Sequence, residues 1–272
     1  MIDAFCKRHQ DGWLSKNTTD LAYVKSRRSR RARVVMVLHQ QVEDWLTSRK
    51  AAFQSDCRPF VTLSYAQSWG GSITTKKGLA VALSGADSIC LTHQIRSLHD
   101  GLLVGIGTVL SDDPQLTVRE WSGANPQPIV LDSSLRMPES ARLCRHPDRQ
   151  CWILTTGCHA DVECRGAEII TLNNAVSARG VSLDSALQLL FQRGIRSLMV
   201  EGGARVISAF LRARLVDAVV LTVAPVLLGG YKAINDLGTS SLEELPCIDP
   251  LYTERLGNDL IAWGDIRYGK QP

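Results

Sequence analysis

From residue 60 onward, short runs rich in β-branched and other apolar residues alternate with stretches whose apolar residues recur at helical spacing. This alternation is typical of strands joined by crossover helices. Several of the runs are apolar at successive positions, which predicts a sheet covered on both faces. We therefore expect an α/β domain with strands over residues 60–66, 101–105, 128–132, 152–155, 168–172, 197–200, 218–223 and 260–263.

Helices are expected between these strands. Ser84 is the expected N-cap of a helix through residue 99, Ser182 that of a helix over 183–192 with Gly194 as its C-cap, and a third helix covers 203–213. Upstream, an apolar stripe at helical spacing predicts a helix over about residues 33–53. Since Pro59 marks a boundary, we divide the chain into an N-terminal helical extension, residues 1–57, and an α/β domain, residues 58–272.

The composition is that of a globular protein, and the two parts of the chain differ in net charge. The 272 residues are 44% hydrophobic and 21% charged, which excludes a disordered or fibrous protein. The net charge of +4 comes from residues 1–57, with 11 Lys and Arg against 6 Asp and Glu, and six of the nine residues at 25–33 are basic. This cluster is either a solvated face or a contact for nucleic acid or anionic lipid, and its shortness favours the solvated face.

The chain shows no sign of a membrane, secretory or metal-binding segment. Its apolar stretches fall short of the roughly 20 residues of a membrane span, and its first residues lack the apolar core of a signal peptide. We therefore expect a cytoplasmic protein with reduced thiols, because no CxxC pair occurs. No metal is expected, although several Cys and His residues lie close together in the sequence. Their spacing matches no zinc-binding pattern; these residues are Cys144, His146, Cys151, Cys158, His159 and Cys164.

Two expected strands lead directly into glycine, in the segments LLVGIGT (102–108) and MVEGGA (199–204). Ligands of open α/β sheets bind beyond the carboxyl ends of the strands, where helix N-termini offer free N–H donors to phosphate. One such segment could be only a tight turn, but two at matching strand ends favour a nucleotide site. Neither is a Rossmann fingerprint or a P-loop.

The segment TVLSDDPQLTVR (108–119) places hydroxyl, carboxylate and guanidinium groups directly after the first glycine turn. Asp112 and Asp113 before a proline predict a capped turn. Carboxylates suit ribose hydroxyls, and Arg119 suits a phosphate. Glu201 is a second carboxylate at a strand end. His93 and His99 are interpreted as solvated or core histidines.

Taken in order, these segments resemble the pyrimidine reductase family of riboflavin biosynthesis, the reductase half of the bifunctional diaminohydroxyphosphoribosylaminopyrimidine deaminase/reductase. The resemblance covers four fifths of the chain and rests on AQS (66–68), IGTVLSDDP (106–114), LTVR (116–119), VLDS (130–133), VEGGA (200–204), LVD (215–217) and APVLLGG (224–230). It implies a dihydrofolate-reductase-like fold, with a mostly parallel central sheet and helices on both faces, and a homodimer. It also implies NADPH-dependent reduction of the ribosylamino group of a pyrimidine ribose 5′-phosphate to ribitylamino.

The resemblance also implies binding residues, although it assigns no catalytic residue. NADPH would contact Ala66, Thr108, Asp112, Ser133 and the segment Gly203, Ala204, Arg205, Val206, Ile207, Ser208 and Ala209. The substrate would contact Arg96, Leu116, Arg119 and Glu201, with the two arginines on the ribose phosphate. The zinc deaminase signature of the bifunctional enzymes has no counterpart in residues 1–57, so a stand-alone reductase is expected.

Two departures from the family keep alternatives open. Ser64 stands near a position where members carry Lys, and Gly70 stands where they carry Asp. Opening the ribose ring requires proton movement, so a paralogue that reduces a different small substrate with NADPH is one alternative. Another is a non-catalytic nucleotide-binding protein whose basic N-terminal segment contacts nucleic acid. The order of reduction and deamination, and the choice of NADPH over NADH, also stay open.

Overall fold

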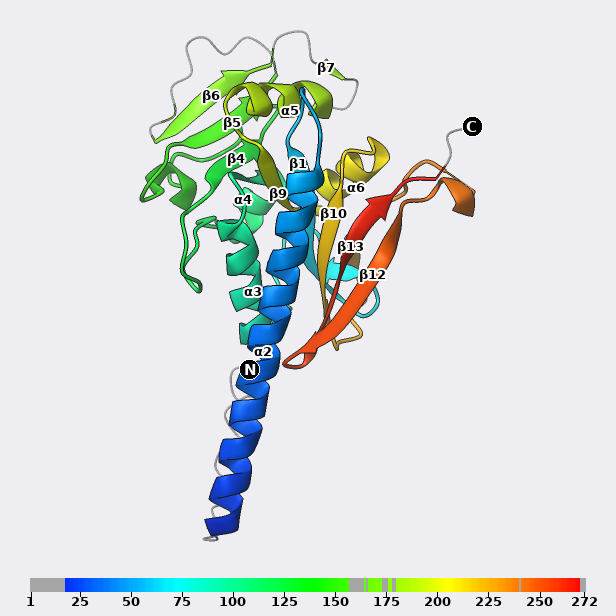
Figure 1. Ribbon diagram of the computed structural model, residues 1–272. Helices are drawn as coiled ribbons and strands as arrows, with labels where there is room; N and C mark the ends of the chain where they lie inside the picture. Colours follow the sequence, from blue (N-terminus) through cyan, green and yellow to red (C-terminus); the bar gives the residue numbers. More distant parts are fainter. Residues whose placement is uncertain are drawn as a thin grey trace. The chain divides into compact units, whose positions relative to one another are not determined.

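The structure is a computed structural model that describes residues 18–156, 164, 166–172, 176–177, 180–239 and 241–269, with the backbone alone for 18–34, 176–177 and 180. The chain divides into two compact units, Met1–Leu38 and His39–Pro272. The division falls within helix α2, Thr18–Ala52, the long blue helix of Figure 1. The expected division at residues 57 and 58 stays a prediction.

The predicted end of helix α2 agrees with the structure, but its predicted start at residue 33 is wrong, because the helix begins at Thr18. The extra turns, residues 18–32, contain four Arg and two Ala, which favour a helix without forming an apolar stripe. The side chains of the basic cluster at 25–33 lie outside the described residues. None of the helices in the described part of the chain has the length and hydropathy of a membrane span.

Nine strands of the described residues form one sheet in the order β12-β13-β10-β1-β9-β3-β4-β5-β6 (Figure 1). From β10 to β6 the neighbouring strands pair in parallel, and β13 pairs antiparallel with both β10 and β12. The predicted mostly parallel sheet is confirmed. The strands are β1 Phe60–Ser68, β3 Gly101–Gly105, β4 Gln127–Leu131, β5 Cys151–Thr155, β6 Ala167–Thr171, β9 Ser197–Gly202, β10 Ala218–Ala224, β12 Cys247–Leu256 and β13 Asp259–Arg267.

Every predicted strand is present, but one strand of the sheet and two small pairs were missed. Strand β12 was not predicted because most of its residues are exposed and it contains Pro250, so its sequence shows no apolar alternation. The small antiparallel pairs are too short to carry a pattern: β2 Ser72–Thr74 with β11 Tyr231–Lys232, and β7 Val176–Ser177 with β8 Gly180–Val181.

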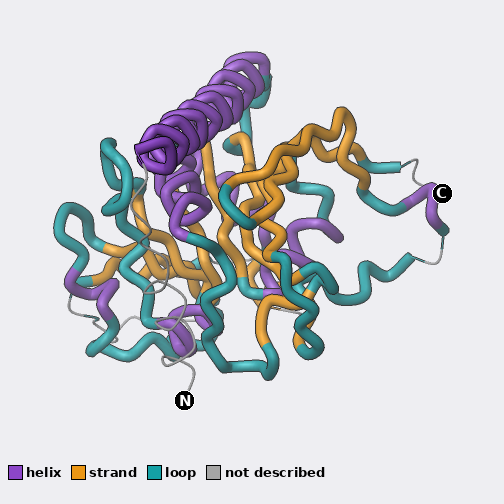
Figure 2. Tube along the Cα trace, turned by 90° about the horizontal axis from the view of Figure 1, so that it is seen from below, coloured by secondary structure: helices purple, strands orange, loops and turns teal. Residues whose placement is uncertain are grey.

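The helices between the strands are α3 Ala86–Ser97, α4 Ile106–Asp112, α5 Leu183–Gln192 and α6 Ala204–Arg212, with short 3-10 turns at Arg142–Arg145 and Leu242–Glu244. The Ser182 cap is confirmed, since its Oγ accepts from the Ser185 N–H. Gly194 follows the actual C-cap, Arg193, at φ +92°. The connections, teal in Figure 2, run mainly around the outside of the sheet.

Two of the expectations near α3 and α4 are wrong. Gly85, rather than Ser84, caps α3, because Asp259 of β13 accepts from the Gly85 N–H at 2.8 Å and from the Ser88 hydroxyl at 2.6 Å. The expected turn at Asp112 and Asp113 is the end of helix α4, which Asp113 closes in the left-handed conformation at φ +40°.

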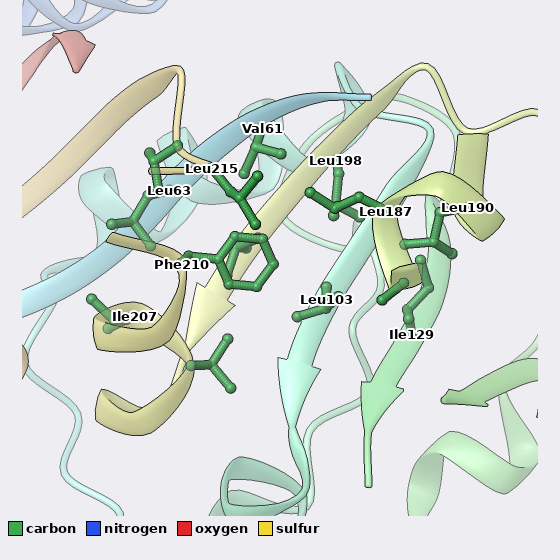
Figure 3. Close-up of a cluster of buried hydrophobic side chains, with 14 of the residues drawn as sticks. Val61, Leu63, Leu103, Ile129, Leu187, Leu190, Leu198, Ile207, Phe210 and Leu215 are labelled. Atoms are coloured by element: carbon green, nitrogen blue, oxygen red, sulfur yellow. The ribbon is translucent and has the colours of Figure 1, made fainter. Parts of the chain in front are cut away.

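Helices cover both faces of the sheet, as predicted. On one face the Phe210 ring of α6 packs among Leu63, Ile207 and Leu215 (Figure 3). The residue next to Leu63, Thr62, points to the other face, where its hydroxyl lies 2.8 Å from Nε2 of His99 at the end of α3. The alternation along β1 thus joins the apolar core on one face of the sheet to α3 on the other face.

Candidate active site

A cavity of about 1700 Å³ lies at the carboxyl ends of strands β1, β3, β4 and β9. The last residues of these strands line it, including Ala66, Gly105, Leu131 and Glu201. Pockets for single small ligands commonly have volumes of roughly 300–1,000 Å³, so this cavity has room for a dinucleotide beside a second ligand. Its place matches the crevice where open α/β sheets bind ligands.

The two glycine turns meet in this cavity, as predicted. Strands β3 and β9 pair in parallel, with Leu103 opposite Val200 and Val104 opposite Gly202, so their ends lie side by side. The Thr108 hydroxyl of α4 donates to the Gly202 carbonyl at 3.3 Å and ties the two turns together. Helices α4 and α6 therefore both begin at the cavity.

The glycines allow this close approach of helix and strand. A Cβ on Gly105 would lie 2.7 Å from Cγ2 of Val206, so a larger residue there would push α6 away from β3. Gly203, the residue before α6, has φ +80°, a conformation that favours glycine. The exposed N–H groups of such a turn are suited to a phosphate.

The structure brings most of the predicted binding residues to the cavity. All the predicted NADPH residues except Ser208 line it, and so do Arg96, Arg119 and Glu201 among the predicted substrate residues. Ser208 is fully buried, where its hydroxyl donates to the Ala204 carbonyl and accepts from the Asn235 N–H. Leu116 is also buried outside the cavity lining. The structure therefore does not bring Ser208 and Leu116 to the cavity surface, where the predicted contacts with NADPH and substrate would require them.

Arg96 and Glu201 form an ion pair with two hydrogen bonds. Nε of Arg96 donates to Oε1 of Glu201 at 2.5 Å and a terminal nitrogen donates to Oε2 at 2.7 Å, while the other nitrogen donates to the Thr117 carbonyl at 2.9 Å. Burial opposes the charge of Arg96, but the Glu201 carboxylate outweighs burial and raises the pKa of the guanidinium. Since the guanidinium is directed at Glu201 and Thr117, the main phosphate ligand left among the predicted residues is Arg119.

Arg119 differs from Arg96 in its exposure. Its side chain is 52% exposed, and its recorded ion pair, with Glu120, is long at 3.9 Å. The backbone N–H of Arg119 donates to Nδ1 of His93, which lines the cavity, at 3.0 Å. Burial, followed by the charges of Arg96 and Arg119, lowers the pKa of His93 to about 4, so its ring is neutral near pH 7.

His93 is a site residue that the sequence interpretation left as a solvated or core histidine. It stands three positions before Arg96 on helix α3, and this spacing places both on one helix face. The three-residue spacing between His93 and Arg96 was the signal in the sequence that could have identified His93 as a site residue. His99, three positions after Arg96, is buried beyond the helix end, in agreement with the core interpretation.

The cavity lining carries an excess of positive charge. Three carboxylates, of Asp112, Asp184 and Glu201, face six cationic side chains of Lys77, Arg96, Arg119, Arg136, Arg205 and Arg212. Such an excess favours ligands with several phosphate groups. Ser64 lines the cavity and is itself mostly buried, whereas Gly70 lies in the turn after β1, outside the lining, where its carbonyl accepts from Lys232.

No metal centre is formed by the residues that the structure describes, where no three His, Cys, Asp or Glu side chains gather closely enough to hold an ion. Cys158 and His159 of the cysteine-rich stretch lie outside the described residues. Within the described part, Cys144 and Cys164 are free thiols whose sulfur atoms lie 3.9 Å apart.

Comparison with known proteins now identifies the family. Residues 59–262 match the model of the RibD C-terminal domain. The chain belongs to this family. It is 32% identical over 211 residues to the riboflavin biosynthesis protein RibD of Aquifex aeolicus, covering 76% of this chain and 57% of that protein, so it spans little more than half of that relative's length.

The chain also matches relatives of which it covers a larger share. It is 34% identical over 190 residues to the 2,5-diamino-6-ribosylamino-4(3H)-pyrimidinone 5′-phosphate reductase of Debaryomyces hansenii, covering 63% of this chain and 77% of the relative. Among solved structures, RibD of Acinetobacter baumannii superimposes with a TM-score of 0.66 at 24% identity, over 77% of this chain and 58% of that chain. The riboflavin biosynthesis reductase Rib7 of Saccharomyces cerevisiae gives 0.64 at 24% identity, over 80% and 94%. The predicted family and fold are confirmed.

Proposed function

We propose that the protein is an NADPH-dependent oxidoreductase that reduces the ribosylamino group of a pyrimidine ribose 5′-phosphate to a ribitylamino group in riboflavin biosynthesis. The observation that carries this proposal is the shared cavity at the ends of β3 and β9, which is cationic and wide enough for two phosphorylated ligands. Relatives named as reductases of a ribosylaminopyrimidinone 5′-phosphate support it. In keeping with the family resemblance, we propose a cytoplasmic homodimer.

The residues of the cavity fit a bound NADPH, whose nicotinamide supplies the hydride. Gly203 and the first turn of α6 would hold its pyrophosphate, with Thr108 and Asp112 opposite and Ala66 near the end of β1. Ser133 and Arg136, after β4, also line the cavity and offer donors suited to the 2′-phosphate that distinguishes NADPH from NADH. The protein thus contributes positioning and electrostatics.

The second ligand would lie between Arg119 and Glu201. Arg119 has free donors for the ribose phosphate. The Glu201 carboxylate, held in place by Arg96, would accept hydrogen bonds from amino groups of the pyrimidine or from ribose hydroxyls.

One observation favours a second candidate, an NADPH-dependent reductase that acts on a different small substrate. Ser64 lines the cavity near a position where the family resemblance implies a lysine, so a group that would move a proton near the ribose is replaced there by a hydroxyl. In this candidate the cofactor site is unchanged, and the acceptor is another imine, ketone or pterin-like compound.

The decisive experiment measures NADPH oxidation by the purified protein. It is offered 2,5-diamino-6-ribosylamino-4(3H)-pyrimidinone 5′-phosphate, its deaminated counterpart and a panel of other acceptors, with NADH in parallel. We expect turnover of at least one of the two pyrimidines and a preference for NADPH. Oxidation with another acceptor alone would support the second candidate, and failure to bind either dinucleotide would overturn both. Rescue of a riboflavin auxotroph that lacks its reductase is the matching test in cells.

A further inference from the structure

The residues Arg119, Glu120 and Trp121, here called the 119–121 segment, lie outside regular secondary structure. No helix or strand ladder fixes the backbone of this segment. The proposed function nevertheless requires the Arg119 guanidinium to hold a phosphate in a reproducible place, because small displacements of a bound substrate are costly in rate. The contacts of the segment with its neighbours therefore decide how well Arg119 is positioned.

His93 of α3 anchors the beginning of the segment. Its Nδ1 accepts from the N–H of Arg119 at 3.0 Å and lies 3.5 Å from the N–H of Glu120. An imidazole accepts a hydrogen bond through a ring nitrogen only where that nitrogen carries no proton, so the proton of the neutral ring is on Nε2. Because burial and two nearby guanidinium groups keep the pKa of His93 near 4, the anchor is intact at neutral pH.

His39 of helix α2 anchors the other end of the segment. Its ring stacks on the Trp121 indole with centroids 4.9 Å apart and an interplanar angle of 13°. The Trp121 side chain is otherwise partly exposed, whereas His39 is almost fully buried. The stacking therefore covers one face of an indole that belongs to the segment carrying the phosphate ligand.

Gln94 of α3 connects the two anchors. Its amide nitrogen donates to the Glu43 carboxylate at 2.7 Å, so its oxygen accepts from Nδ1 of His39 at 2.6 Å. Gln94 follows His93 directly in the chain. Helix α3 and residues 39–52 of α2 thus form one hydrogen-bonded support for the 119–121 segment. Residues 39–52 precede residue 59, where the match to the RibD C-terminal domain begins.

We propose that residues 39–52 of helix α2 help to position the substrate ligand Arg119, because His39, together with His93, holds the 119–121 segment and thereby places Arg119 for a phosphate ester. His39 and His93 are positioning residues in this proposal, which rests on the proposed function for the identity of the ligand. If residues 39–52 had only a structural role, disrupting their contacts would lower the stability of the fold without changing recognition of the phosphate.

The test compares paired variants of the full-length protein. Trp121→Ala removes the stacking and Trp121→Phe keeps an aromatic face, while His93→Leu removes the acceptor and His93→Asn keeps one near the place of Nδ1. Gln40→Ala is the control on the same helix, because Gln40 is exposed and its side chain bonds Asp44 within α2. Amide hydrogen exchange of residues 117–123 reports the anchoring directly, without any ligand.

We expect faster exchange at Arg119 and Glu120 in Trp121→Ala and His93→Leu, with exchange close to the wild type in the other three variants. For the ribosylaminopyrimidine 5′-phosphate, KM should rise about tenfold in the two disruptive variants, while kcat and the KM for NADPH change less than about twofold. Unchanged exchange in both disruptive variants would overturn the anchoring. Faster exchange with an unchanged substrate KM would overturn its link to recognition.

Failure of the proposed function has a different signature. The wild type would then turn over neither pyrimidine phosphate, while the exchange experiment still decides whether the two histidines hold the segment. In that case, calorimetric titration with ribose 5-phosphate replaces the kinetic measurement. Weaker binding in Trp121→Ala and His93→Leu than in Gln40→Ala would support the proposal, and equal binding in all variants would overturn it.

Discussion

At the residue scale, the charge of Arg96 is stable inside the protein only because Glu201 accompanies it. The two side chains are 11% and 15% exposed. Glu201→Gln would leave the guanidinium mostly buried with no opposite charge, at a cost of about 3 kcal/mol in the free energy of unfolding. Urea denaturation measures this loss.

Glu168→Gln is the matched control, because Glu168 pairs with Arg193 at a similar distance of 2.7 Å but on the surface. Exposed pairs contribute little, so this variant should lose at most about 1 kcal/mol. Equal losses in the two variants would show that burial of the Arg96–Glu201 pair has no energetic consequence.

Arg119 is expected to contribute to substrate binding and little to folding. Its side chain is half exposed and makes one long ion pair, so Arg119→Ala should leave the thermal midpoint nearly unchanged. Hydrogen bonds to charged groups contribute about 2 kcal/mol, which predicts a roughly thirtyfold rise in KM for the pyrimidine phosphate. Arg119→Lys keeps the positive charge but lacks the planar guanidinium, so its KM should lie between that of the wild type and that of Arg119→Ala. An unchanged KM in Arg119→Ala would place the phosphate elsewhere.

At the element scale, the sequence predicted best those elements whose pattern is local. Strands such as β3 and β9 are continuous apolar runs, because helices cover both faces of the sheet, and glycine marks their ends. Strand β12 has an exposed face and α4 is only seven residues long, so neither carries a periodic signal. The local sequence pattern therefore predicted the strand ends that form the cavity, but it did not predict strand β12 or the extent of helix α4.

The pairing of side chains inside the site was not predictable from the sequence alone. Arg96 and Glu201 are 105 positions apart, and only the register of β9 beside β3 and the packing of α3 bring them together. The stacking of His39 on Trp121 likewise joins a helix to a loop. The sequence interpretation named Arg96 and Glu201 as ligands of the substrate, but it had no means of showing that they are each other's partners.

The start of helix α4 allows a test in which stability and cofactor binding change in opposite directions. Gly107 lies inside this helix and a Cβ there would meet no atom within 4 Å, so Gly107→Ala should stabilise the fold by up to about 1 kcal/mol. The added methyl group would lie at the cavity, where Gly107 is part of the lining, and should weaken NADPH binding. Chemical denaturation and a fluorescence titration with NADPH measure the two effects.

Gly105→Ala is the comparison for Gly107→Ala, since its Cβ would lie 2.7 Å from Val206 and force α6 away from β3. Overpacking of this kind costs roughly 1–3 kcal/mol, so this variant should lose both stability and cofactor affinity. A loss of stability in Gly107→Ala as large as that in Gly105→Ala would contradict the placement of Gly107 at an open helix start.

At the scale of the whole molecule, a buried histidine joins the sheet to helix α3, which carries His93 and Arg96 of the cavity lining. His99 is hydrogen-bonded to the Ile95 carbonyl of α3 and to the Thr62 hydroxyl of β1. Burial is the main cause that lowers the pKa of His99 to about 4. Protonation of this ring would place a charge between the helix and the sheet.

Stability should therefore fall in mild acid. Between pH 6.5, near the pKa of an unfolded histidine, and pH 4, the unfolded chain binds a proton that folded His99 does not, so the free energy of unfolding decreases as the pH falls. At pH 5 the loss from this residue amounts to about 2 kcal/mol. Denaturation of the wild type and of His99→Gln at pH 7.5 and pH 5 measures it. The variant, less stable at pH 7.5, should lose less on acidification, and equal losses in the two proteins would mean that His99 is already protonated in the fold.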